Sequence, residues 1–449
     1  MRSIVEPPRP LPLFAEHDVI VLGGGPAGIA AAASAARAGA DTLLVERYGF
    51  LGGMGTAAGV TNFCGLYANV FGESRRVVQG VADDLLDRMR ELDGLAEPHL
   101  IFGKVHAQAY DMSAYKCAAD ALLADAGASV LFHALAAGVV RHGDGRLDAL
   151  IVETKSGRMA LRARVFVDAS GDADLAHWAG LPLEKGGVDG SLLYPTLMFR
   201  LGAVDALRAG DAWQTIPKRM DEAAAAGEYR FPRRGAIVRP QRHGGEWRAN
   251  VTQIRNADGS AADGTDARSL SAGEAEGRRQ IVEYLRFLRE RVPGFESAYV
   301  LDIAPQLGIR ETRRLVAEAM VGGDDVIACA RVDDAIGVNG WPLEQHVAGD
   351  VLWSWPAIPE SCGYNQLPYR MLLPRRATAG GATNLLVAGR CAGMTHEGQS
   401  AARVSGACFV MGQAAGTAAA LALRAGLAVH DIDRAELQRA LREQGAFLG

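Results

Sequence analysis

The beginning of the chain carries the pattern that most limits its fold: a short apolar run, a glycine-rich turn and a helix of small residues. The run Asp18–Leu22 has the composition of a strand buried on both faces. The turn Gly23–Gly28 (GGGPAG) follows at once, small residues continue to about Arg37, and a second apolar run, Thr42–Val45, ends at Glu46. This order predicts a βαβ unit, and therefore a parallel sheet of the Rossmann type.

Each glycine of the turn has a separate physical role. Gly23 permits the tight turn, Gly25 lets the backbone approach a pyrophosphate, and Gly28 lets helix and strand pack closely. The free N–H groups at the start of the helix suit phosphate oxygens. Glu46 stands where an acid accepts a hydrogen bond from a ribose hydroxyl. These residues predict dinucleotide binding, although the first βαβ unit alone does not separate NAD from FAD.

Changes in composition along the chain predict an insertion in this domain. After about Leu193 the pattern shifts to β-rich, with strands expected at Thr196–Gly202, Gly235–Val238 and Trp247–Gln253 and an amphipathic helix at Ala272–Val292. From Asn384 the chain returns to dinucleotide-fold composition. The predicted divisions are an extended tail at 1–15, the nucleotide domain at 16–190, a substrate or cap domain at 191–375, the rest of the nucleotide domain at 376–425 and a helical tail at 426–449.

Composition excludes several classes of partner. The net charge of -5 is small for 449 residues, so we expect no nucleic acid. Six cysteines stand without C-x-x-C spacing, which argues against a metal site or a dithiol pair. Prolines occupy the N-terminal segment where a signal peptide has apolar residues, and we expect a cytoplasmic protein. The low-charge stretches near Gly23–Ala36 and Val404–Leu423 are rich in Gly and Ala, so we expect no membrane span.

Four later motifs accompany the βαβ unit. They are Leu51–Thr56 (LGGMGT), Asp168–Ala176 (DASGDADLA), Gly308–Arg314 (GIRETRR) and Gly389–Ala420 (GRC…THE…GQAAGTAAA). With the first glycine turn, they resemble flavoproteins of the glutathione-reductase-like class, in the branch of succinate dehydrogenase and fumarate reductase. The closer resemblance is to a family known as FAD-dependent oxidoreductases, from Asp18 to about Arg424. It implies an α/β fold in which a discontinuous Rossmann-type FAD-binding domain holds an inserted β-rich α+β substrate domain.

The resemblance also implies where FAD contacts the chain. The glycine turn would face the pyrophosphate, Glu46 the adenosine ribose and Ala136 the adenine. Arg390 stands where many flavoproteins have an acid, and it would neutralise either the pyrophosphate or a flavin carbonyl. Small residues at the start of the last helix would face the flavin ring. The implied contacts are Gly23, Gly25, Pro26, Ala27, Gly28, Glu46, Arg47, Gly53, Met54, Ala136, Gly171, Asp172, Gly389, Arg390, Gly406 and Ala407.

Two residues are candidates for catalysis. His396 lies in the loop before the last helix and has an ordinary pKa near neutrality, so it is predicted to move a proton; the alternatives are a helix cap or a flavin contact. Arg310 is predicted to hold a substrate carboxylate, with an internal salt-bridge network as the alternative. Five arginines of the middle region suggest an acidic substrate, but a solvated face is the preferred interpretation: Arg233, Arg234, Arg239, Arg242 and Arg248.

The predicted function is an oxidoreductase that exchanges a hydride between a small organic substrate and flavin N5. Two alternatives stay open: a monooxygenase that uses NAD(P)H and oxygen, and a non-catalytic FAD-binding electron-transfer protein. The expected partners are a small-molecule substrate, an electron acceptor that the sequence does not identify, and a possible second copy of the chain.

Overall fold

A mainly parallel sheet forms the centre of the protein, whose computed structural model describes residues 4–5, 7–378 and 380–449. The parallel strands run in the order β8-β2-β1-β11, and β22 pairs with the end of β11 on its other edge. Their bounds are β1 (Leu13–Leu22), β2 (Thr42–Val45), β8 (Ser129–Leu131), β11 (Gly157–Asp168) and β22 (Leu385–Val387). The predicted N-terminal tail includes residues 1–3 and 6, which lie outside the described part.

The long strand β11 connects the parallel strands to an antiparallel extension. Its first half pairs with β10 (Leu147–Thr154), which in turn pairs with β9 (Leu135–Arg141). Its second half lies between β1 and β22. The first strand starts earlier than the expected Asp18, because Leu13 already pairs with Ala160 of β11. The sequence pattern missed these residues because they lie at the exposed end of the strand.

Alternate residues of β1 face two different layers. Val19 and Val21 belong to a core shared with the helices α1 (Pro26–Arg37), α3 (Val81–Glu91), α4 (Met112–Ala126) and α11 (Ser405–Ala425). Ile20 and Leu22 belong to a second core with β9, β10 and the short helix α5 (Asp174–Trp178). The sheet is therefore covered on both faces, as parallel sheets require.

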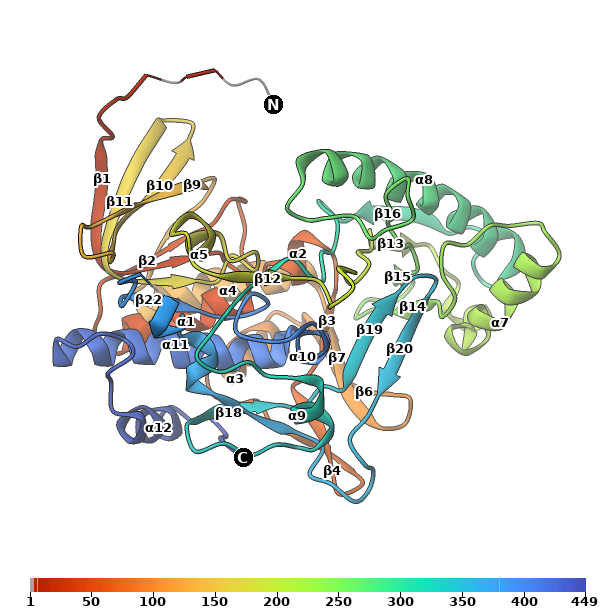
Figure 1. Ribbon diagram of the computed structural model, residues 1–449. Helices are drawn as coiled ribbons and strands as arrows, with labels where there is room; N and C mark the ends of the chain where they lie inside the picture. The colour runs from red at the N-terminus through yellow and green to blue at the C-terminus, as the bar shows by residue number, and fades with distance from the viewer. Residues whose placement is uncertain (1–3, 6, 379) are drawn as a thin grey trace.

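The helices α1 and α11 pack directly on one another beside the sheet (Figure 1). A Cβ atom on Gly412 would lie 2.0 Å from the carbonyl oxygen of Ala27, and one on Gly416 would lie 2.1 Å from that of Ala31. Within the described residues α11 alone is long and apolar enough to cross a membrane, yet 89% of its apolar window is buried inside the protein. Its small residues serve close helix packing.

A separate lobe on the right of Figure 1 carries its own core. Four antiparallel strands run in the order β14-β15-β13-β16, and the long helix α8 lies along them. Aromatic side chains fill the space between, among them Trp247, Tyr284 and Phe287. The bounds are β13 (Phe199–Gly202), α7 (Ala212–Ala225), β14 (Ile237–Pro240), β15 (Trp247–Asn250), α8 (Ala267–Arg291) and β16 (Tyr299–Ile303). This arrangement is the expected α+β insertion.

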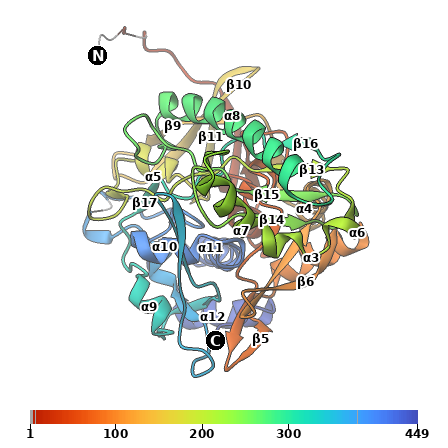
Figure 2. The same ribbon diagram turned by 90° about the vertical axis from the view of Figure 1, so that its right-hand side faces the viewer.

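Smaller elements fill the region between and below these two parts (Figure 2). The hairpin β19–β20 and the strands β3, β7 and β6 lie beside the lobe (Figure 1). The remaining bounds are α2 (Met54–Ala57), β3 (Asn62–Phe63), β4 (Tyr67–Val70), β5 (Glu73–Arg76), β6 (Leu95–Ile101), β7 (Val105–Tyr110), β12 (Leu183–Lys185), α6 (Ala206–Ala209), β17 (Arg313–Leu315), α9 (Gly323–Ile327), β18 (Ala335–Asn339), β19 (Leu343–Val347), β20 (Asp350–Ser354), β21 (Asn365–Pro368), η1 (Tyr369–Leu372), η2 (Arg376–Thr378), α10 (His396–Ala402) and α12 (Arg434–Glu443).

Candidate functional site

The first glycine turn has the geometry that dinucleotide binding requires. Gly23 adopts a φ of +101°, and a Cβ atom there would lie 2.5 Å from the carbonyl oxygen of Ala169. A Cβ atom on Gly28 would lie 1.7 Å from the carbonyl oxygen of Gly23. Gly25 caps α1 and Pro26 is its first residue, so the helix begins with its free N–H groups at the turn. The tight turn at Gly23 and the close packing at Gly28 are as predicted, and the contact of Gly25 with a pyrophosphate stays a prediction.

Glu46 connects the turn to the end of β2. Its side chain is buried, Oε2 accepts a hydrogen bond from the N–H of Gly24 at 2.6 Å, and Oε1 accepts one from the N–H of Tyr48 at 2.9 Å. A second glycine loop, in the motif Leu51–Thr56, lies against the first glycine turn. A Cβ atom on Gly53 would be 2.7 Å from the Cα atom of Gly25. The carboxylate is thus held in one orientation at the cavity wall.

The motif Asp168–Ala176, at the end of β11, forms a loop that is held by hydrogen bonds between its own residues. Asp168 is fully buried, and its carboxylate accepts hydrogen bonds from the N–H and hydroxyl of Ser170 and from the N–H of Ala176. Burial raises the pKa of Asp168. Burial, with the nearby charges of Asp172 and Asp168, raises the pKa of Asp174 to about 7. Gly171 and Asp174 line the cavity, whereas Asp172 is directed to neighbouring side chains.

Arg390 supplies a positive charge next to this loop. Its Nη2 donates to Oδ1 of Asp172 at 3.0 Å, while its Nη1 is buried without a hydrogen-bond partner in the described structure. The side chain lies over Gly171, where a Cβ atom would come within 2.9 Å of Nη2. A shielded guanidinium nitrogen without a partner fits an anionic group in the cavity. The glycine loops and Arg390 together fit a dinucleotide.

The N-terminal end of α11 contacts the cavity through residues other than the expected Gly406 and Ala407. Val404, Ser405 and Cys408 line it, whereas Gly406 and Ala407 do not. The N–H of Gly406 donates to the carbonyl of Cys64 at 2.9 Å, and a Cβ atom on Gly406 would lie 2.1 Å from the carbonyl oxygen of Gly65. The small residues therefore face protein backbone. Gly28 is also absent from the wall, while the other expected cofactor residues apart from Asp172 line it.

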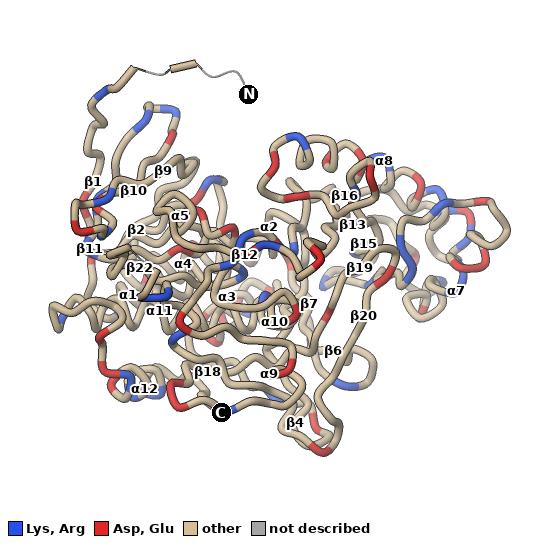
Figure 3. Tube along the Cα trace, viewed as in Figure 1, with Lys and Arg blue, Asp and Glu red and all other residues tan. Residues whose placement is uncertain are grey.

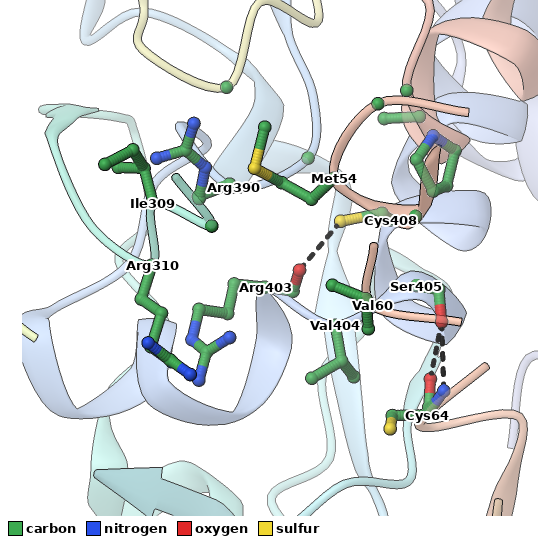
Figure 4. Close-up of a pocket in the computed structure, with 18 of the residues that line it drawn as sticks. Met54, Val60, Cys64, Ile309, Arg310, Arg390, Arg403, Val404, Ser405 and Cys408 are labelled. Carbon is green, nitrogen blue, oxygen red and sulfur yellow. Dashed lines mark hydrogen bonds between the residues drawn. The ribbon is translucent and has the colours of Figure 1, made fainter. Parts of the chain in front are cut away.

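The same cavity continues to the inserted lobe, where its wall becomes rich in arginine. Arg239 of β14 and Arg248 of β15 come from the lobe, and Arg310 and Arg403 come from later segments. Arg248 and Arg310 are only 4% and 5% exposed. Figure 4 shows the guanidinium groups of Arg310 and Arg403 side by side, with Arg390 above them. Arg310 also donates to the carbonyl of Tyr194 at 2.5 Å.

Glu344 and His346 form a buried pair in this wall. Nε2 of His346 lies 3.0 Å from Oε1 of Glu344, and the indole N–H of Trp341 donates to Oε2 at 2.9 Å. Burial, followed by the charge of Arg310, lowers the pKa of His346 well below its ordinary value. Burial opposes ionisation of Glu344, but the hydrogen bonds from His346 and Trp341 and the charges of His346 and Arg403 together outweigh it and lower the pKa of Glu344 to about 2.

An apolar surface completes this end of the cavity. Ile101, Phe102, Trp341 and Trp353 line it together. The rings of Phe102 and Trp353 pack edge to face with centroids 5.2 Å apart, and those of Trp341 and Trp353 with centroids 6.0 Å apart. The end of the cavity at the inserted lobe forms a chamber, which combines a cationic wall with an apolar wall.

The expected arginine face is wrong in its main feature. Arg233 and Arg248 are buried, and Arg239 is half-buried with its guanidinium 3.9 Å from the ring centroid of Trp213. Arg234 is exposed, and Arg242 pairs with Asp93 at the surface. Arg239 of β14 and Arg248 of β15 are paired across the sheet and therefore share one face, which composition alone does not show. Over the rest of the trace, acidic and basic residues are interspersed (Figure 3).

The two predicted catalytic residues lie in different places. Arg310 is in the cavity wall, whereas His396 is not among the lining residues. Nδ1 of His396 lies 2.8 Å from Oε2 of Glu311, whose fully buried carboxylate also pairs with Arg314 and accepts the N–H of Leu193. The placement of His396 favours a positioning role, and its catalytic role stays a prediction.

The segment around Glu311 joins three parts of the site. Arg313 pairs with Asp174, the hydroxyl of Thr312 donates to Asp172 at 2.7 Å, and Arg314 donates to the carbonyl of Met394 at 3.0 Å. The expected internal network is therefore present beside Arg310. Sequence reasoning missed Glu344, His346 and Arg403, although Glu344 and His346 stand two apart on one strand and so share a face.

Three known proteins show the extent of similarity between this chain and others. Digeranylgeranylglycerophospholipid reductase 1 of Methanothermobacter thermautotrophicus (strain ATCC 29096 / DSM 1053 / JCM 10044 / NBRC 100330 / Delta H) is 29% identical over 180 residues, which cover 38% of this chain and less than half (43%) of that relative. A geranylgeranyl bacteriochlorophyll reductase-like structure from Thermoplasma acidophilum is 15% identical, with a TM-score of 0.49 over 97% of this chain and 84% of its own. A p-nitrophenol 4-monooxygenase from Pseudomonas putida DLL-E4 is 11% identical, with a TM-score of 0.48 over 97% and 87%.

These individual similarities are too low to transfer a reaction. The match to a whole family is broader: the model of the FAD dependent oxidoreductase family covers residues 18–441, which include both glycine loops, the inserted lobe and α11. FAD is the dinucleotide that the cavity's glycine loops and Arg390 fit. The chain belongs to the family of FAD-dependent oxidoreductases.

Proposed function

We propose that this enzyme exchanges a hydride between a small organic substrate and N5 of FAD. One observation carries the proposal: a single cavity is lined at one end by the glycine loops and at the other by the inserted lobe. The first end has the groups that hold a dinucleotide, and the second has a chamber wall of arginines and aromatic rings. A substrate bound in the chamber would lie next to the flavin end of the cofactor.

The chain's own groups would position the cofactor. Glu46 would accept the hydroxyls of the adenosine ribose, the start of α1 would bind the pyrophosphate, and the buried Nη1 of Arg390 would donate to an anionic oxygen. The start of α11, at Val404 and Ser405, would face the flavin ring with the positive end of its dipole. All these groups are oriented by hydrogen bonds or backbone packing.

The test begins with the purified protein. Released cofactor is expected to be FAD, with about one molecule per polypeptide, and chromatography after denaturation distinguishes it from FMN. Anaerobic bleaching of the flavin absorbance by an organic substrate supports hydride exchange. If NADH or NADPH alone bleaches the flavin and product forms only with oxygen, the enzyme is a monooxygenase and the proposal is wrong. A protein without FAD would overturn it entirely.

A further inference from the structure

The arginines of the chamber lack the negative partners that buried charges normally have. In the described part of the chain, no carboxylate oxygen lies within the 4.0 Å of an ion pair from Arg239, Arg248, Arg310 or Arg403. Their neighbours are mostly backbone carbonyls: Arg248 donates to Val60, and Arg310 donates to Tyr194. The Nε atoms of Arg248 and Arg403 are shielded from solvent and have no hydrogen-bond partner among the described residues. Such groups are costly to bury unless a ligand satisfies them.

The charge at this end does not balance. Four arginines line it, and Glu344 is the one carboxylate among its lining residues, so three positive charges are in excess. Glu344 is already occupied by His346 and by the indole of Trp341. Burial, with the charges of Arg403 and Arg233, lowers the pKa of Arg310 well below its ordinary value. The chamber therefore favours an anion.

The cofactor's phosphates belong to the opposite end. The pyrophosphate would bind where α1 begins and where Arg390 offers its free Nη1, next to the glycine loops. Arg239 and Arg248 instead stand on the strands of the inserted lobe, and Arg310 is directed toward Arg403 (Figure 4). Their excess charge needs a second anion. The neighbouring wall is apolar, with Phe102, Trp341 and Trp353, so that anion would carry an apolar body.

We propose that the substrate is an apolar carboxylate. Its carboxylate binds between Arg248, Arg310 and Arg403, and its aromatic or alkyl body packs on the tryptophans of the chamber. Two converging guanidinium groups offer parallel N–H donors that match the two oxygens of a carboxylate. This inference rests on the proposed function, because it assigns the ligand of the same cavity.

The test measures binding to the FAD-loaded enzyme and needs no turnover. Changes in the visible absorbance of bound FAD are followed while 3-phenylpropionate or 3-phenylpropanamide is added, at one ionic strength. The two probes have the same body and differ in the carboxylate. We expect the acid to bind at least tenfold more tightly than the amide. Equal affinities, or binding of neither probe, would overturn the carboxylate assignment.

Variants then locate the binding groups. Arg310→Gln and Arg403→Gln are each expected to weaken the acid tenfold or more and to leave the amide unchanged, while Arg310→Lys restores part of the affinity. Arg234→Gln, an exposed arginine of the same lobe, is the matched control and should change neither. If Arg310→Gln and Arg403→Gln both bind the acid as the parent does, the inference is wrong.

Cofactor content separates the two proposals. FAD per polypeptide and the position of the flavin band are measured for each variant before titration. A parent enzyme that lacks FAD contradicts the proposed function itself. A parent that holds FAD and is reduced by a substrate, but binds acid and amide alike, contradicts the carboxylate inference alone. Loss of FAD from Arg403→Gln with unchanged acid binding in Arg310→Gln would assign these arginines to the cofactor and overturn the inference.

Discussion

Glu46 shows how one side chain serves structure and binding together. Its two oxygens accept hydrogen bonds from the N–H groups of Gly24 and Tyr48, and its position at the end of β2 is the one from which an acid is predicted to bind a ribose. The carboxylate is therefore fixed before a ligand arrives, so little entropy is lost when the ligand binds.

Replacing this residue tests the cofactor contact. Glu46→Ala removes hydrogen bonds to a charged acceptor, which are worth about 1.5–3 kcal/mol, so FAD should bind roughly tenfold to a hundredfold more weakly. Equilibrium dialysis or fluorescence titration of the apoprotein measures the change. Glu16→Ala, at an exposed position on β1, is the control. Unchanged FAD affinity in Glu46→Ala would show that the ribose is held elsewhere.

His396 contacts the carboxylate of Glu311 and does not line the cavity, so we expect it to contribute to stability rather than to proton transfer. In His396→Ala, the buried carboxylate of Glu311 keeps Arg314 and the N–H of Leu193 but loses one partner, so the protein should lose about 1–3 kcal/mol of stability. Denaturant unfolding measures this loss. Flavin reduction by an active substrate should stay within about threefold of the parent in FAD-loaded protein. A hundredfold slower reduction at full FAD occupancy would restore the catalytic interpretation.

At the scale of elements, the close packing of α1 on α11 depends on glycines of α11 that lie against the backbone of α1. Gly412 lies against the carbonyl of Ala27 in the first turn of α1, next to the loop that is predicted to bind the pyrophosphate. This contact with α11 fixes the position of the first turn of α1. A side chain there would push the two helices apart and move the helix N-terminus away from the phosphates.

Gly412→Ala should therefore destabilise the enzyme, although alanine is the better helix former. The added Cβ would stand 2.0 Å from a backbone oxygen, and overpacking of this kind costs about 1–3 kcal/mol. Thermal and denaturant unfolding give the size of the effect. Gly244→Ala, at an exposed turn with no atom within 4 Å of the new Cβ, should stay within about 0.5 kcal/mol. Equal effects of the two changes would contradict the packing argument.

The sequence correctly predicted those helices and strands whose positions depend on neighbouring residues in the chain. The βαβ start depends on glycine geometry and on a buried apolar run, so the turn, α1 and β2 were found at their positions. The helix α8 begins five residues before the expected Ala272, because Asp266 caps it through the N–H of Ser269. The arginine chamber was not predicted. Its arginines come from the paired strands β14 and β15 and from two later segments, at Arg310 and Arg403, and only their packing shows that Arg248 and Arg310 are buried.

At the scale of the whole molecule, the cavity brings together segments from nearly the entire chain. Its lining runs from Leu22 in the first strand to Cys408 in the last core helix, and includes the inserted lobe between them. The nucleotide domain itself is discontinuous, since β22 and α11 return to complete it after the lobe. A ligand that fills the cavity would connect both parts of this domain. Folding stability should therefore depend on FAD more strongly than on any single side chain.

Removal of FAD tests this dependence. A ligand that binds only the folded protein adds about 2.7 kcal/mol at a free concentration one hundredfold above its Kd, so the apoprotein should unfold at a clearly lower temperature. Calorimetry of the apoprotein, with FAD added back stepwise, should show one transition that rises with the logarithm of FAD concentration. ADP is the control ligand, because it fills only the end with the glycine loops and should stabilise less. If FAD raised the midpoint no more than ADP at equal saturation, the flavin end would add nothing to the coupling between the lobe and the nucleotide domain.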